Sequence, residues 1–176
     1  MFTDVIIMAG GIGERLWPAS SVEMPKQFMA IDGKISFLQQ SIQRALALNI
    51  TGKIVIVTRK DIEEHCTRQC FDLAQLENEN NKQKILNDTV VLAEPAGRHT
   101  SAAIMSGICY LNKITGTEDH SVLVMTSDQV IEPVNVFCSD CEKAFKASSD
   151  GKIVCFAIPP TEPSVGYGYI KTGNDI

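Results

Sequence analysis

Apolar residues form several short, mostly β-branched runs along this chain. Segments of this kind are residues 5–8, 53–58, 89–93, 121–125 and 152–157. Continuous apolar runs of this length are typical of strands that are buried on both faces of a parallel sheet. We therefore predict a strand in each of these segments.

Other segments place apolar residues at the spacing of one helix face. These segments are 36–46, 60–76, 101–111 and 134–147. Ser36 stands in the position of an N-cap for the first of them. Residues 77–84 are polar and show no periodicity, so we expect a solvated connection there.

Strands that alternate with helices in this way predict an α/β fold with a mostly parallel sheet covered on both faces. The chain has 176 residues, 44% of them hydrophobic, which suits one compact domain. In such folds, ligands bind at the carboxyl ends of the strands. Unusual loops follow three of the predicted strands here, at residues 10–15, 94–100 and 127–128.

The loop after the first strand has the chemistry of a phosphate site. Gly10, Gly11 and Gly13 permit positive φ, so backbone N–H groups can turn inward around an anion. Arg15 offers a planar fork of donors, and Lys26 offers a compact point charge. A simple tight turn is the alternative, but it would not need two cations so close by. The pattern is neither a P-loop nor a good dinucleotide fingerprint.

Residues 10–18 resemble the signature G-G-x-G-x-R-[LF]-x-P of the sugar-phosphate nucleotidyltransferases, which is followed by P-K. Trp17-Pro18 and Pro25-Lys26-Gln27-Phe28 are similar to the mannose-1-phosphate guanylyltransferase branch. The resemblance implies a three-layer, Rossmann-like nucleotidyltransferase fold. It also implies transfer of GMP from GTP to mannose-1-phosphate, which gives GDP-mannose and pyrophosphate.

The same resemblance implies roles for individual residues. Arg15 and Lys26 would be catalytic, and the nucleotide would be bound by Ala9, Gly10, Gly11, Gly13, Glu94, Arg98, Thr100 and Ser127. Residues 94–100 resemble the segment E-P-x-x-R-N-T, with His99 in place of asparagine. Glu94 could accept hydrogen bonds from N1–H and the amino group of guanine, and an ion pair between Glu94 and Arg98 is the alternative. His99 suits a helix start and a ligand contact equally well.

Asp128 directly follows a predicted strand and has no neighbouring cation in sequence. Mg²⁺ prefers one or two carboxylates together with phosphate oxygens, so we predict that Asp128 is a magnesium ligand. The alternative is a helix N-cap. The segment resembles P-S-D-H, with Thr126 and Gln129 in place of the proline and the histidine.

Residues 166–170 read G-Y-G-Y-I, which resembles a segment on the sugar-phosphate side of the family's cleft. The resemblance implies that Gly166 allows close approach of the sugar and that Tyr167 supplies a flat face with a hydroxyl. A turn that enters a strand at 169–171 is the alternative.

The net charge of −5 argues against a nucleic-acid partner, so any phosphate site must be a local group of cations. No run of about 20 apolar residues suggests a membrane span, and the start of the chain lacks the features of a signal peptide. We therefore expect a cytoplasmic protein, with its six cysteines reduced. Metal binding by Cys138 and Cys141, or by Cys66 and Cys70, is the less favoured interpretation. Homo-oligomers are compatible with the sequence.

Segments that the family carries further along, such as F-x-E-K-P, do not occur in residues 1–176. We therefore expect these residues to be the N-terminal, nucleotide-binding part of a longer catalytic domain. Two other functions stay open: a nucleotidyltransferase for another base or sugar phosphate, and a nucleotide-binding or interaction module without activity.

Overall fold

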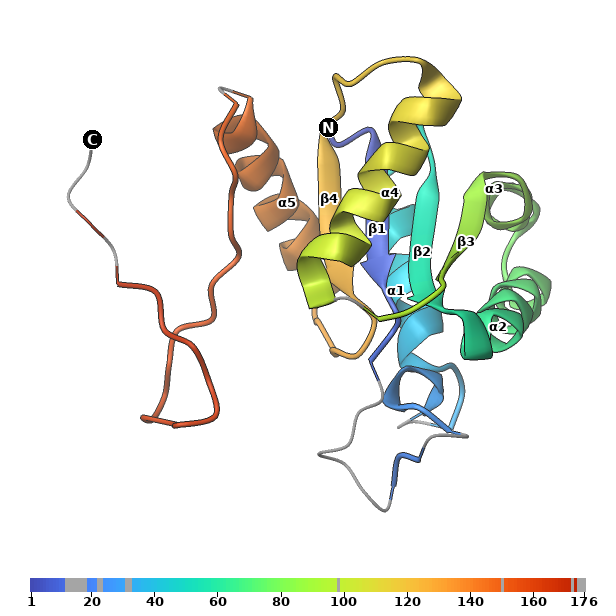
Figure 1. Cartoon of the computed structure of the whole chain (residues 1–176), viewed down its shortest axis with the longest axis horizontal. Coiled ribbons are helices and arrows are strands. Elements are labelled where there is room, and N and C mark those ends of the chain that lie inside the picture. Colours follow the sequence, from blue (N-terminus) through green and yellow to red (C-terminus); the bar gives the residue numbers. More distant parts are fainter. Residues whose placement is uncertain are drawn as a thin grey trace.

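The computed structural model describes residues 1–11, 19–21, 24–30, 33–97, 99–149, 151–171 and 173. Its elements are β1 (Asp4–Met8), η2 (Lys26–Phe28), α1 (Phe37–Ala47), β2 (Ile54–Arg59), η3 (Lys60–Ile62), α2 (Glu63–Leu76), α3 (Glu79–Asp88), β3 (Thr89–Glu94), α4 (His99–Thr115), β4 (Val122–Thr126) and α5 (Val134–Ser148). Strands and helices alternate, which confirms the predicted α/β class (Figure 1).

The sheet in the described part of the chain has the order β3-β2-β1-β4, and every pair in it is parallel. β1 lies between β2 and β4, with Ile7 opposite Ile56 on one side and Met125 on the other. Val5, Ile6 and Ile7 are 0% exposed. The continuous apolar run of β1 therefore reflects burial on both faces, and the carboxyl ends of all these strands lie at one edge of the sheet.

Alternate side chains of β1 point to opposite helical layers, as the pleat of a strand requires. Val5 and Ile7 pack into the cluster that holds the buried side chains of α1, α2 and α5. Ile6 packs on the other face, with Ala103 and Leu111 of α4. The molecule thus has three layers, with α4 on one side of the sheet and α1, α2 and α5 on the other.

The predicted helices form, although their ends shift by a few residues. α1 begins after Ser36, whose Oγ accepts a hydrogen bond from the Gln39 N–H at 3.2 Å, and Gln39 Oε1 accepts one from the Ser36 N–H at 2.9 Å. This reciprocal pair is a capping box, which confirms the N-cap role of Ser36. No helix among the described residues combines the length and the apolar character that crossing a membrane demands.

The prediction of a solvated connection at 77–84 was wrong, because α3 begins at Glu79. Asn78 caps this helix, and its side chain accepts a hydrogen bond from the Asn81 N–H at 3.1 Å. Ile85 is 2% exposed and is the apolar anchor of α3, while its other faces are polar. A single buried position leaves no visible periodicity, so the sequence pattern did not reveal the helix.

The strand predicted at 152–157 does not form, and neither does the alternative strand at 169–171, although the structure describes both segments. Residues 151–171 instead form an irregular segment that starts near the end of α5 and then leads away from the sheet and turns back on itself (Figure 1). Ile153 is 96% exposed, whereas Val154 is half-buried against the core cluster. A strand exists only where a neighbouring strand pairs with it, and sequence propensity cannot supply that partner.

The buried cysteines behave as small apolar side chains. All six cysteines are free. Burial raises the pKa of Cys66 to about 11 and that of Cys70 to about 12, so both thiols stay protonated at neutral pH. The spacing of Cys66 and Cys70 along α2 therefore places both side chains in the hydrophobic core.

Replacing Gly107 of α4 with valine should destabilise the protein, because α4 approaches β1 closely there. A Cβ on Gly107 would lie 2.7 Å from Ile6 Cδ1 and 3.0 Å from Ile6 Cγ1. Overpacking of this kind typically lowers the free energy of unfolding by about 1–3 kcal/mol, which urea denaturation would measure. Met105→Val introduces the same side chain at a position of α4 that is 56% exposed, and it should cost less than about 1 kcal/mol. Equal losses in the two variants would contradict this account of the packing.

Candidate functional site

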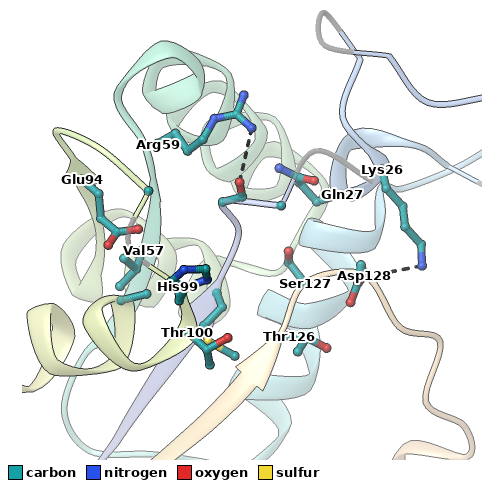
Figure 2. A pocket seen from close by; sticks show the side chains of 15 residues that line it. Lys26, Gln27, Val57, Arg59, Glu94, His99, Thr100, Thr126, Ser127 and Asp128 are labelled. Atoms are coloured by element: carbon teal, nitrogen blue, oxygen red, sulfur yellow. Dashed lines mark hydrogen bonds and ion pairs between the residues drawn. The ribbon is translucent and has the colours of Figure 1, made fainter. Parts of the chain in front are cut away.

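A cavity of about 340 Å³ opens at the carboxyl edge of the sheet (Figure 2). Its lining includes Gly10 after β1, Arg59 at the end of β2, Glu94 at the end of β3 and Asp128 after β4. This is the edge at which the strand pattern predicted a ligand site. Pockets of this size are typical of small-molecule sites.

Several of the predicted site residues line this cavity, although they come from distant parts of the sequence. They are Gly10, Gly11, Lys26, Glu94, Thr100, Ser127 and Asp128. Gly13, Arg15 and Arg98 lie outside the described residues, so their roles stay predictions.

Gly166 and Tyr167 do not line the cavity. They belong to the irregular segment 151–171, and Tyr167 is 73% exposed. The cavity is therefore lined by some of the residues predicted for the nucleotide but not by Ala9, and the residues predicted for the sugar phosphate lie elsewhere.

Ala9 lies at the root of the glycine loop and is fully buried. Its carbonyl oxygen accepts hydrogen bonds from Gln27 Nε2 at 2.8 Å and from Thr58 Oγ1 at 3.0 Å. The carbonyl oxygen of Gly10 accepts a hydrogen bond from Arg59 Nη1 at 3.3 Å (Figure 2). Side chains from η2 and β2 thus hold the start of the loop in place.

Lys26 and Asp128 form an ion pair at the rim of the cavity, with Nζ 3.5 Å from Oδ2 (Figure 2). Both are partly exposed, with side-chain exposures of 26% for Lys26 and 45% for Asp128. Tertiary structure therefore supplies the cation that Asp128 lacks in sequence. The N-cap alternative for Asp128 was wrong, because Pro133 occupies the N-cap of α5.

The protein groups around Asp128 could bind a metal ion only together with oxygen atoms from a bound ligand. Within the ranges that the structure describes, no group of three or more His, Cys, Asp or Glu side chains could hold a metal ion. Mg²⁺ needs only one or two protein carboxylates where phosphate oxygens complete its coordination. The carboxylate of Asp128 in the cavity wall fits that arrangement.

Arg59 is a cavity residue that sequence reasoning missed. Its guanidinium donates from Nε to Asp61 Oδ1 at 2.9 Å and from Nη2 to Asp61 Oδ2 at 2.7 Å. The hydrogen bond with Asp61 raises the pKa of Arg59, so this group stays charged. A signal was available, because Arg59 follows an apolar run and the carboxyl-end rule applies to every strand of a parallel sheet. In the sheet register, Arg59 stands beside Glu94.

His99 also lines the cavity, at the start of α4 (Figure 2). Its backbone φ is 69°, in the left-handed region that few side chains adopt. Backbone strain of this kind often accompanies functional sites. His99 therefore starts α4 and lines the cavity, and its contact with a ligand stays a prediction.

Comparisons with known proteins identify the family of this chain. The sequence profile of a family described as "Nucleotidyl transferase" matches residues 4–176. The mannose-1-phosphate guanylyltransferase of Salmonella muenchen is 36% identical over 172 residues, which cover 97% of this chain and 34% of that protein. The mannose-1-phosphate guanylyltransferase 2 of Escherichia coli O157:H7 is 38% identical, over 96% of this chain and 32% of that protein. This chain thus spans about a third of the length of these curated relatives.

Solved structures share the fold at lower sequence identity. The crystal structure of "mannose-1-phosphate geranyltransferase" from Thermus thermophilus matches with a TM-score of 0.61 and 22% identity, over 86% of this chain and 39% of that one. The mannose-6-phosphate isomerase from Helicobacter pylori matches with a TM-score of 0.60 and 18% identity, over 86% of this chain and 48% of that one. These likenesses concern the fold alone. The profile match over nearly the whole sequence shows that the chain belongs to the nucleotidyl transferase family.

Proposed function

We propose that this chain carries the nucleotide-binding side of a mannose-1-phosphate guanylyltransferase. Such an enzyme transfers GMP from GTP to mannose-1-phosphate, giving GDP-mannose and pyrophosphate. The observation that carries the proposal is the cavity in which the glycine loop, Lys26, Glu94 and Asp128 meet from separate segments. The names of the curated relatives support the choice of substrates.

The glycine loop and Lys26 form the phosphate end of the proposed site. Backbone N–H groups at Gly10 and Gly11, with Arg15 from the same loop, suit the β- and γ-phosphates of GTP. Lys26 is paired with Asp128, and the exposure of both side chains keeps this pair weak. A triphosphate would therefore draw the Lys26 ammonium group to itself and release the carboxylate.

The released Asp128 carboxylate would then hold Mg²⁺ together with phosphate oxygens. When bound, the ion neutralises charge on the triphosphate. Ser127 is 3% exposed, and its N–H donates a hydrogen bond to the Met8 carbonyl oxygen at 3.2 Å. This contact ties the loop that carries Asp128 to the end of β1, next to the glycine loop.

Glu94 would select the base. Its carboxylate is in the cavity wall, at the end of β3. Guanine presents two neighbouring donors, N1–H and the 2-amino group, which a carboxylate can accept together. Adenine lacks this pair, and a buried acceptor left without its donors costs binding energy. Thr100 would add a polar contact from α4.

The proposed reaction needs positioning and positive charge more than proton transfer. A phosphate oxygen of mannose-1-phosphate attacks the α-phosphorus of GTP. A new O–P bond forms, the bond between the α-phosphorus and the bridging oxygen breaks, and pyrophosphate leaves with that electron pair. The nucleophile is already anionic, so no general base is required. Arg15 and Lys26 would hold the mutually repelling anions in line.

A second candidate is nucleotide binding without transfer. It is favoured by one observation: Gly166 and Tyr167 lie outside the cavity. In either case we propose a cytoplasmic location, which the six free thiols support because a reducing compartment keeps cysteines unpaired.

GTP should stabilise the chain more than ATP, UTP, CTP or dTTP in a thermal-shift panel with Mg²⁺, because bound ligand raises the melting temperature with saturation. Glu94→Gln should remove this preference, since an amide offers only one acceptor to the two guanine donors. Glu64→Gln is the matched control, because Glu64 is 90% exposed on α2. Equal stabilisation of the unsubstituted chain by ATP and GTP would contradict the assignment of Glu94.

Arg15→Ala should lower kcat/KM for pyrophosphorolysis of GDP-mannose by at least about 100-fold, as loss of a transition-state cation commonly does. GTP formed from GDP-mannose and pyrophosphate is the measured product. Arg68→Ala removes an arginine that is 67% exposed on α2 and should leave the rate unchanged. Unchanged turnover in Arg15→Ala would rule out its catalytic role. GTP binding without any turnover by the unsubstituted chain would select the second candidate.

The ion pair between Lys26 and Asp128 should contribute little stability to the ligand-free protein. A double-mutant cycle with alanine at both positions should give a coupling energy below about 1 kcal/mol in urea denaturation, because both groups reach solvent. The exposed pair Lys143–Asp140 on α5 is the control and should give a similarly small value. A coupling energy several times larger would mean that the pair is a structural clamp and does not open for a ligand.

A further inference from the structure

The carbonyl groups at the root of the glycine loop are held by side-chain donors. The Ala9 carbonyl oxygen is bound by Gln27 and Thr58, and the Gly10 carbonyl oxygen is bound by Arg59. Carbonyl oxygens carry partial negative charge, which would repel a bound anion. Here donors of the protein engage two consecutive carbonyl oxygens.

The orientation of a carbonyl group also determines that of the amide in the same peptide unit. In a trans peptide the C=O and N–H bonds are coplanar and point in opposite directions. The bond from Arg59 to the Gly10 oxygen therefore aims the Gly11 N–H away from Arg59, and Gly10 and Gly11 both line the cavity. The bonds to the Ala9 oxygen set the direction of the Gly10 N–H in the same manner.

The guanidinium of Arg59 is itself held in place. Nε and Nη2 donate to the two carboxylate oxygens of Asp61, and Nη1 donates to Gly10. All three of its nitrogens thus have partners within the protein. The Arg59 side chain is 17% exposed, whereas that of Asp61 is 57% exposed. The geometry is that of a support for the loop.

We propose that Arg59, anchored by Asp61, is a positioning residue that aims the Gly11 N–H at a bound polyphosphate. It acts through the Gly10 carbonyl group and does not itself need to contact the ligand. The inference rests on the proposed function for the identity of the anion, a nucleoside triphosphate. The positioning of the loop by Arg59 does not depend on that identity and would apply to any polyphosphate.

The direction in which one substitution changes the affinity for GTP distinguishes a positioning role of Arg59 from direct contact between its charge and the phosphate. Asp61→Ala leaves the positive charge of Arg59 in place and removes a nearby negative charge. If Arg59 bound phosphate directly, this variant should bind GTP as tightly as the unsubstituted chain or more tightly. If Arg59 positions the loop, loss of its anchor should weaken binding although the local charge becomes more favourable.

The test is a calorimetric titration of the whole chain with GTP and Mg²⁺. Arg59→Ala and Asp61→Ala should each raise Kd about three- to tenfold, the range expected for loss of an orienting hydrogen bond. Arg68→Ala and Glu64→Ala make the same two changes of charge in an exposed pair on α2 and should change Kd less than about twofold. Melting temperatures identify any variant that does not fold. If Arg59→Ala does not fold, the result for Asp61→Ala decides the test, because Asp61 is exposed.

Each result has a definite meaning. Unchanged or tighter binding by Asp61→Ala overturns the proposal, even if Arg59→Ala binds weakly, because that combination indicates direct contact. If the unsubstituted chain does not bind GTP, the proposed function fails, and the same variants are titrated with tripolyphosphate and Mg²⁺. Weaker tripolyphosphate binding by both Arg59→Ala and Asp61→Ala would then keep the positioning role. No binding of tripolyphosphate by the unsubstituted chain would overturn it.

Discussion

The burial of β1 between two parallel neighbours is the constraint on which the rest of the structure depends. Val5, Ile6 and Ile7 have no access to solvent, so β1 can lie only where both of its faces and both of its edges are covered. Parallel pairing with β2 and β4 then brings the ends of all the strands to one edge. Four loops that are distant in sequence meet there, and the cavity forms between them.

An acidic protein needs a local device to bind a polyphosphate, and we propose the start of the glycine loop for this role. The chain carries a net charge of −5, and the cavity at this edge of the sheet is lined by the cations Lys26 and Arg59 as well as by Glu94 and Asp128. Gly10 and Gly11 also line the cavity, and Arg59 and Gln27 donate hydrogen bonds to the carbonyl oxygens of Gly10 and Ala9. Glycine lacks a side chain that would restrict such a loop, so its conformation must be held from outside.

The predictions that failed share a physical cause. α3 has one deeply buried residue, Ile85, and polar contacts hold the rest of the helix, so no period was visible. The segment 152–157 has strand propensity but no strand beside it. Arg59 was overlooked because no motif surrounds it, although its place at the end of a predicted strand pointed to this edge of the sheet. In each case the deciding partner is distant in sequence.

The sequence by itself determined the class of fold, the strands and helices with strong periodicity, the capping of α1 by Ser36, and the composition of the loops at the carboxyl edge. These features follow from local spacing and residue chemistry, which a linear pattern records. Tertiary structure decided that Lys26 pairs with Asp128, that Arg59 supports Gly10, and that Tyr167 lies apart from the cavity. Such contacts depend on strand register and on distances between separate segments. A linear pattern does not contain these quantities, and packing of the whole chain determines them.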